Sequence, residues 1–530
     1  MPTDCIRQQV FQQMAKKFLL TTCLIVISTF QNTIAQNRNL TLPTYHWAQD
    51  FLLELRLRNP NQTLFSGARP FSVHQISNVL QSQTTNTGFE KFLHQRLGDF
   101  QNGFAPKLDL NDGEPVFHLG AIASNRFGRI DGEARSVLSN RFLMGASFSP
   151  NFHVVNALHF DESLLTDPNY VGRVWNDIAV FTEQAYGIYA RERFSLKFGR
   201  DFLRWGRGRD ASLILSDHSR TIDHFQFQWR SKKFQFTWFA GKLDPMRVSD
   251  SVAAALGAPK AERYLTGGRV DFSFFNNKLQ LGAAQTVLYG TAGGPKWFFL
   301  NPFIVYHGEI LNDGLEANSM GAVDFSFFPK PGLEFYGELF IDDFQLEASV
   351  IDDLEPNEIG VILGGEIADP GNVSGMALGA EYTRVTNRTY NSPTEFDKYL
   401  HRNRSLGHFL GNDFDRWLLH GRHYFGGGLQ VFLSAEFLRK GEGRIDAIFD
   451  TPWLNSTLEQ GYSEPFPTGV VEKTKKFSLR LRWQPKWRVF AEVAGSYASS
   501  NNFANIENAE NSGTEVSLRL WYEWHKFLKL

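Results

Sequence analysis

The chain has 530 residues, 14% of them aromatic, and its mean hydropathy is −0.29. The formal net charge is −2 and the isoelectric point is about 6.7, so the chain lacks the basic character that a nucleic-acid partner requires to neutralise its phosphates. Length alone allows several ordinary domains, but a large β-barrel uses hundreds of residues as one unit.

The first residues predict a secretory signal peptide. Lys16 and Lys17 precede the apolar run "FLLTTCLIVISTF", and polar residues with "TIA" lead to Ala35, after which we expect cleavage. The run is too short to span a membrane as a helix. A buried core helix and a lipoprotein anchor at Cys23 are the alternatives. Because Cys5 and Cys23 are both in this segment, the mature chain is expected to contain neither a disulfide nor a catalytic thiol.

Residues 36–105 predict a small N-terminal helical unit. Trp47, Phe51 and Leu55 recur at helical spacing, and Thr44 is placed to cap that first helix.

Two further helices follow in the same unit. Ser72 is the predicted N-cap of the helix in "VHQISNVL", and Thr87 and Glu90 have the spacing of a capping box. Three short helices bury little apolar surface alone, so we expect them to pack against something larger, as a barrel plug or as a periplasmic unit.

From about residue 106 onward the chain repeats a hairpin pattern. In "HFQFQWRSKKFQFTWF", which starts at His224, aromatic residues alternate with polar ones on both sides of a short polar turn. "RVDFSFFNNKLQLG" and "FSLRLRWQPKWRVFAEV" show the same alternation around equally short turns. The segments between hairpins are long and rich in Gly, Pro and charged residues.

The apolar face of these strands could point at a protein core or at lipid. A secreted sandwich would bury it against a second sheet. The export signal, the alternation of short turns with long loops, and aromatics at strand ends favour lipid; those aromatics are Trp229, Trp238, Trp483 and Trp487. A closed barrel also satisfies its own backbone hydrogen bonds, which lipid demands.

We therefore predict an all-β transmembrane barrel with a small N-terminal helical bundle. The expected domains are a signal peptide at 1–35, a helical unit at 36–105 and an outer-membrane β-barrel at 106–530. The barrel segment, at roughly 23 residues per strand, suggests about 18 antiparallel strands. We expect a monomer in the cell outer membrane, surrounded by outer-membrane lipid and inserted by the barrel-assembly machinery. The amphipathic last strand "TEVSLRLWYEW" suits that machinery.

The densest group of candidate binding residues is in "GRDFLRWGRGRDASLILSD", where Arg200, Arg204, Arg207 and Arg209 surround Trp205. These charges cannot face lipid, so they must face the lumen or a loop. Arginine forks bind carboxylates bidentately and a Trp face stacks on a sugar ring, so the group suits an acidic polysaccharide. The alternative is a structural set of luminal ion pairs with Asp201, Asp210, Asp324 and Glu338.

A second candidate group is in "LNPFIVYHGEILNDG", with Asn301, His307 and Glu309. On a strand, His307 and Glu309 would share one face, where they could act together in acid–base catalysis or metal binding. No third ligand is evident in the sequence. We therefore expect no catalytic residue, no metal and no cofactor.

The chain resembles the capsule-assembly Wzi family of outer-membrane barrels. The resemblance is carried by "GRDFLRWGRGRDASLILSD", "LNPFIVYHGEILNDG" and "PGLEFYGELFIDDF", with "ARPFSVHQISNVL" in the helical unit, and it spans residues 40 to 345. It implies an 18-stranded barrel with an N-terminal helical bundle that helps attach or assemble capsular or other surface polysaccharide by lectin-like binding. The alternative function is an anion-selective porin or outer-membrane transporter, and an embedded enzyme ranks third.

Overall fold

The structure is a computed structural model that describes residues 35–36, 39–61, 63–82, 87–104, 107–108, 114–130, 133–175, 178–345 and 349–529. The predicted signal peptide, apart from Ala35, is outside these residues. Within the described ranges, no helix is both long enough and apolar enough to cross a membrane.

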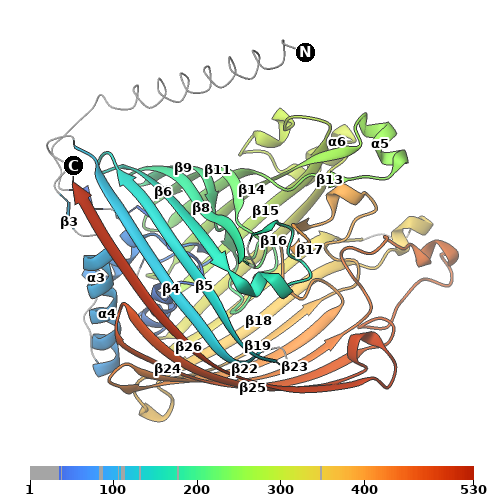
Figure 1. The fold of residues 1–530 in the computed structure, drawn as a ribbon. Helices are drawn as coiled ribbons and strands as arrows, with labels where there is room; N and C mark the ends of the chain where they lie inside the picture. Colours follow the sequence, from blue (N-terminus) through green and yellow to red (C-terminus); the bar gives the residue numbers. More distant parts are fainter. Residues whose placement is uncertain are drawn as a thin grey trace.

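The chain forms a closed antiparallel barrel of 18 strands (Figure 1). Strand β26 pairs with β4 from Val516 opposite Arg129 to Lys529 opposite Val116, which closes the sheet. The predicted fold class is confirmed. The strands are β4 (Val116–Ile130), β5 (Glu133–Ser147), β6 (Phe152–Asp161), β8 (Ile178–Arg191), β9 (Phe194–Asp201), β11 (Ile222–Arg230), β12 (Phe234–Lys242), β14 (Lys260–Phe274), β15 (Leu279–Thr291), β16 (Asn318–Lys330), β17 (Leu333–Asp343), β18 (Glu358–Ala368), β19 (Met376–Val385), β22 (Phe414–Gly426), β23 (Leu429–Lys440), β24 (Glu472–Lys486), β25 (Val489–Asn501) and β26 (Glu510–Lys529).

Shorter strands and helices lie in the segments before and between the barrel strands. The strand pieces are β1 (Ala35–Gln36), β2 (Ala68–Arg69), β3 (Lys107–Leu108), β7 (Val174–Trp175), β10 (Arg204–Trp205), β13 (Met246–Arg247), β20 (Leu400–His401) and β21 (Arg404–Ser405). The α-helices are α2 (Trp47–Arg58), α3 (Val73–Ser82), α4 (Gly88–Phe104), α5 (Asp250–Leu256) and α6 (Tyr306–Asp313). The 3₁₀ helices are η1 (Glu162–Thr166), η2 (Trp297–Leu300), η3 (Ile351–Leu354), η4 (Pro370–Asn372), η5 (Glu395–Asp397), η6 (Pro452–Asn455) and η7 (Phe503–Asn505).

The alternation read from the sequence sets which face of each strand meets lipid. On β24, Phe477 and Trp483 are 48% and 50% exposed on the outside, while Arg480 and Arg482 between them point to the lumen. Side chains of a strand alternate between its two faces, so an apolar outer band and a polar lumen follow from one pattern. Of the aromatics expected at the lipid boundary, Trp229 and Trp483 are exposed, whereas Trp238 and Trp487 are buried under other parts of the chain.

Connections at the two ends of the barrel differ in length. One end carries tight turns such as 192–193, 331–332 and 487–488, and the other carries long segments such as 292–317, 386–413 and 441–471. Outer-membrane barrels place short turns in the periplasm and long loops outside the cell. We name the two ends accordingly.

The three predicted N-terminal helices are present. Thr87 and Glu90 form the capping box of α4: the Glu90 N–H donates to the Thr87 hydroxyl oxygen at 3.1 Å, and the Thr87 N–H donates to the Glu90 carboxylate at 3.0 Å. Ser72 directly precedes α3. Thr44 is not the cap of α2. The helix starts three residues later, and His46 caps it by accepting from the Ala48 N–H.

The helices sit at the periplasmic end and contact the barrel from inside (Figure 1, blue). Their apolar faces share one core with the barrel residues Ile188, Trp487 and Phe490. From α2, Arg56 reaches Glu334 on β17 at 3.3 Å, and Arg58 reaches Asp369 in the turn after β18 at 3.1 Å. Burial against the barrel supplies the apolar contacts that a three-helix unit lacks alone.

Two extracellular segments, 202–221 and 386–413, fold into the lumen. They form a second core in which Trp205, Leu213, Tyr390 and Leu406 pack against inward residues of β12 to β19, among them Phe340. β10 in the first segment pairs with β2 from the linker between α2 and α3. The lumen beside β11 to β19 is therefore filled.

Candidate functional site

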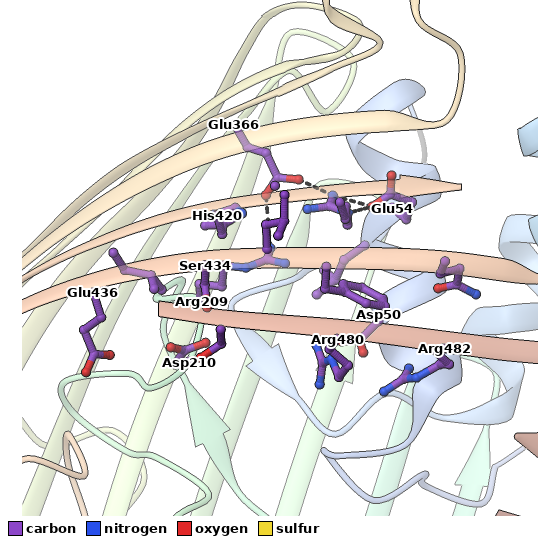
Figure 2. Close-up of a pocket in the computed structure, with 18 of the residues that line it drawn as sticks. Asp50, Glu54, Arg209, Asp210, Glu366, His420, Ser434, Glu436, Arg480 and Arg482 are labelled. Atoms are coloured by element: carbon purple, nitrogen blue, oxygen red, sulfur yellow. Dashed lines mark hydrogen bonds and ion pairs between the residues drawn. The ribbon is translucent and has the colours of Figure 1, made fainter. Parts of the chain in front are cut away.

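A cavity of about 760 Å³ lies between α2, residues 207–210 and the barrel wall of β22 to β26 (Figure 2). Basic side chains outnumber acidic ones in its lining. The basic residues are Arg56, Arg69, Arg126, Arg207, Arg209, Arg416, Arg422, Lys476, Arg480 and Arg482, and the acidic ones are Asp50, Glu54, Asp210, Glu334, Glu366, Glu436 and Glu515.

Strand periodicity builds the cationic wall of this cavity. In "KKFSLRLRW", the apolar residues of β24 face lipid, so Lys476, Ser478, Arg480 and Arg482 face inward. On β22 the same alternation directs Arg416, His420 and Arg422 inward. The wall is a consequence of residue order on neighbouring strands.

On one side of the cavity the charges are paired. The Arg422 Nε–H donates to Glu54 of α2 at 2.6 Å, and the same guanidinium contacts Glu366. Arg209 Nη1 lies 3.1 Å from Glu366, so two arginines and two glutamates join α2, residues 207–210 and the barrel wall. Buried charges of this kind are tolerated only when paired and hydrogen-bonded.

A second ion-pair group holds residues 207–210 from the extracellular side. Arg416 donates to Asp210 at 2.7 Å, and its Nε–H donates to Glu436 at 2.7 Å. Burial would raise the pKa of Asp210, but Arg416 outweighs that effect and the pKa lies below its usual value. Asp210 therefore stays ionised in its loop.

The opposite side has excess positive charge. Arg482 Nε lies 2.8 Å from Glu492, and Arg480 lies 3.8 Å from the same carboxylate with 44% of its side chain exposed. Both guanidiniums lie over the Phe432 ring, at 4.5 Å for Arg480 and 5.4 Å for Arg482. Glu492 is the carboxylate within ion-pair distance of both guanidiniums, and Asp50 of α2, which also lines the cavity, acts electrostatically on Arg480. Among the described residues, no ion pair joins Lys476 to a carboxylate. Arg126, Lys476, Arg480 and Arg482 thus outnumber Asp50, Glu492 and Glu515, a charge balance that favours an anion.

The structure places the arginines predicted from the sequence in different environments. Arg204 is buried, and it donates to the carbonyl oxygens of Gly208 at 2.6 Å and Arg209 at 3.0 Å. Trp205 is 1% exposed and packs edge-on against Phe239 at 5.2 Å. In this structure its ring is covered by protein on all sides.

Arg207 and Arg200 also have protein partners. Arg207 Nε lies 2.7 Å from Asp324 and its Nη1 donates to Ser66. Arg200 Nε donates to Asp223 at 2.8 Å on the neighbouring strand. Arg209 is the most exposed of the five residues predicted in this group, and it lines the cavity.

The alternative interpretation, that these arginines form structural ion pairs in the lumen, is confirmed in part. Arg207 pairs with Asp324, as that alternative proposes. The other carboxylates have different partners: Asp201 pairs with Lys197, Asp210 with Arg416, and Glu338 accepts from backbone N–H groups of residues 207, 208 and 213. The three backbone contacts to Glu338 shape the loop that carries Arg209.

Asn301, His307 and Glu309 lie outside the cavity. The strand predicted for His307 and Glu309 is wrong: both belong to α6, where residues two apart point in different directions. The helix forms because Tyr306 and Ile310, four apart, cover the barrel, and Gly314 ends it with a φ of 58°. In the ranges the structure describes, no group of three His, Cys, Asp or Glu side chains could hold a metal ion.

The cationic wall of β22 to β26 is the part of the cavity that the sequence reading did not single out. Its signal was present in the alternation of "LRLRW". The loops decide which luminal residues remain uncovered, and the alternation of residues along a strand does not predict where the loops fold.

Residues 112–515 match the family model described as capsule assembly protein Wzi. The chain belongs to the Wzi capsule-assembly family. The solved structure of Wzi from Escherichia coli, described as an outer-membrane carbohydrate-binding β-barrel involved in group 1 capsule assembly, has a TM-score of 0.59 at 16% identity. The likeness covers 92% of this chain and 99% of that chain, and it shows the shared fold.

A Klebsiella pneumoniae relative, an uncharacterised 55.8 kDa protein in the cps region, is 28% identical to this Wzi-family chain over 180 residues. The match covers 32% of this chain and about a third of the relative's own length (35%). The closed sheet and its apolar outer band make this member of the Wzi family an outer-membrane protein.

Proposed function

We propose that this barrel binds a surface polysaccharide, capsular or exopolysaccharide, and helps assemble or attach it at the cell surface. Family membership supports the proposal, together with the carbohydrate binding attributed to E. coli Wzi. The remaining parts of the proposal are that the barrel acts as a monomer in outer-membrane lipid and is inserted by the barrel-assembly machinery.

The observation that carries the proposal is the uneven charge of the cavity. One side is neutralised by the Arg422, Glu54, Glu366 and Arg209 group, while Arg126, Lys476, Arg480 and Arg482 outnumber the carboxylates Asp50, Glu492 and Glu515 on the opposite side. An acidic sugar would supply the missing negative charge. Guanidinium forks bind carboxylates bidentately, and the Phe432 ring beneath Arg480 and Arg482 supports both guanidiniums.

Binding without catalysis fits the acidic residues of the cavity. Acid–base hydrolysis of a glycoside needs two carboxyl groups free to act on one bond. Of the seven carboxylates that line the cavity, Glu54, Glu334, Glu366, Asp210 and Glu436 are each within ion-pair distance of an arginine, which leaves Asp50 and Glu515.

Passage of small anions is the second candidate function. It is favoured by Arg126, Arg480 and Arg482 lining one continuous cavity, as in a selective porin. Against it, the helices pack on β6, β8 and β25 at the periplasmic end, and the two loops fill the lumen beside β11 to β19. Single-channel conductance in a planar bilayer separates the two: steady anion-selective conductance of the intact protein favours a porin.

The proposal is tested in cells that lack the gene and carry one of three versions of it. Arg480→Ala with Arg482→Ala removes the excess charge of the cavity, and Arg193→Ala, at an exposed residue in a periplasmic turn, is the matched control. We expect the double variant to release polysaccharide into the medium and the control to retain it. Retention by the double variant, at wild-type levels of inserted barrel, would count against this site.

A further inference from the structure

The extracellular segment between β15 and β16 folds back over the outside of the barrel. On β15, Gln280 and Thr286 contact luminal residues, so Gln285, Val287 and Tyr289 face outward. Val287 and Tyr289 are nevertheless 0% exposed. Phe299, Tyr306 and Ile310 cover them from outside. We call residues 296–313 the flap.

Polar side chains on the outer wall hold the flap. Gln285 donates to the Ile304 carbonyl at 2.6 Å and accepts from the Tyr306 N–H at 3.1 Å. Trp238 Nε1 donates to the Tyr306 hydroxyl at 3.4 Å. These are outward positions of membrane strands, where an unpaired amide would be costly in lipid. These bonds pair the Gln285 amide and the Trp238 N–H of the wall with the Ile304 carbonyl, the Tyr306 N–H and the Tyr306 hydroxyl of the flap.

The far side of the flap is apolar and uncovered. Trp297 is 87% exposed, Phe303 84%, Val305 71% and Leu311 70%. The Phe303 ring stacks beside Phe236 of β12 at 6.3 Å, with an interplanar angle of 10°. This apolar surface therefore continues the lipid-facing band of the wall.

Phe303 lies at the depth of the membrane band. Phe236 is opposite Val270 of β14, Val270 is opposite Ala283 of β15, and Ala283 is opposite Val323 of β16, which is 52% exposed. All four are outward residues of the wall, and Phe236 is two residues from the periplasmic start of β12, so Phe303 lies well below the extracellular ends of the strands. A segment at that depth meets acyl chains.

Helix α6 has the polarity of an interfacial element. Tyr306 and Ile310 face the wall. Leu311 lies on one flank together with His307, whose Nδ1 is 3.0 Å from the Ser319 hydroxyl, and Glu309 and Asn312 lie on the other flank. Figure 1 shows α6 near the extracellular end, away from α3 and α4. The polar flank suits headgroups and the apolar flank suits lipid chains.

We propose that the flap is a membrane-embedded element whose exposed face is covered by lipid acyl chains. The occupant is lipid, because the exposed apolar face is continuous with the lipid-facing band and because Gln285 and Trp238, outward residues of membrane strands, hold the flap against that band. The flap thus enlarges the barrel's lipid contact on the side of β12 to β16.

The test uses spin labels at single cysteines in a variant with Cys5→Ser and Cys23→Ser, reconstituted in vesicles of lipopolysaccharide and phospholipid. Labels replace Phe303, Leu311 or Glu309. The matched control is Ile448, an apolar residue that is 91% exposed in the extracellular loop 441–471. Collisions with oxygen report lipid, and collisions with a water-soluble nickel chelate report solvent.

We expect the labels at 303 and 311 to collide more with oxygen, and the labels at 309 and 448 more with nickel. Equal nickel accessibility at 303 and 448 would overturn the proposal. Gln285→Leu then tests the docking: with the barrel still folded by its gel mobility, the label at 303 should become more mobile and the label at 448 should not change. Unchanged mobility at 303 would contradict the role of Gln285.

Discussion

Replacing Asp324 by Asn should release residues 202–221 from the barrel wall. Asp324 accepts from Arg207 Nε at 2.7 Å and from Arg269 Nη1 at 2.6 Å, and Arg269 also donates to Asp271 at 2.6 Å. All four side chains are at most 2% exposed. The variant leaves two buried guanidiniums facing one carboxylate.

The expected magnitude follows from that imbalance. Breaking a buried ion pair by removing one partner costs about 3–5 kcal/mol. At about 1.4 kcal/mol for each factor of ten, local opening of the loop becomes roughly a hundred to several thousand times more frequent.

Hydrogen–deuterium exchange of the intact barrel measures this opening in peptides covering residues 203–216. The matched control is Asp446→Asn, which breaks the Arg444 pair where the two side chains are 69% and 59% exposed. An exposed pair contributes about 0–1 kcal/mol, so the control leaves protection nearly unchanged. Equal protection of residues 203–216 in wild type and Asp324→Asn would refute the reasoning.

Three further predictions concern the core, the extracellular loop and the helices. Trp205→Ala should lower the free energy of unfolding by about 3–5 kcal/mol in urea titrations, whereas Trp297→Ala, at a ring that is 87% exposed, should leave it nearly unchanged. Equal effects of the two changes would contradict the burial of Trp205 in the loop core. Burial raises the pKa of Asp397 in η5 to about 8, so the folded loop favours the protonated carboxyl. The stabilisation of the loop by this proton is complete below about pH 4 and is lost as the pH rises towards 8. Asp397→Asn should abolish this pH dependence of hydrogen exchange in the loop, once the rates are corrected for intrinsic exchange. Deleting residues 36–104 should raise single-channel conductance severalfold; an unchanged value would mean that the helices do not obstruct the lumen.

The fold was largely predictable because its determinants are local and repeated. Alternation in "FSLRLRW" assigns one face of β24 to lipid and the other to the lumen, and short polar turns separate such strands. The Thr87 and Glu90 spacing was sufficient to predict the start of α4, since both capping bonds are within one turn.

The candidate site was less predictable because its partners are distant in sequence. The glycine-rich arginine group could be placed in the lumen, but the pairing of Arg207 with Asp324 joins residues 117 positions apart. The burial of Trp205 depends on loop packing rather than on neighbouring residues. The sequence predicts a strand for the α6 segment, whereas the structure has a helix. Tyr306 and Ile310 become one buried face only through their contact with Val287 and Tyr289, which forms in the folded chain.

The measurement that tests the central claim most directly is titration calorimetry of the purified barrel with oligosaccharides from its own bacterium's surface polysaccharide, alongside Arg480→Ala with Arg482→Ala. A charged hydrogen bond is worth about 1.5–3 kcal/mol, so the account predicts saturable binding that weakens at least about tenfold in the double variant. No binding by the wild type, or equal affinity in both proteins, would contradict it.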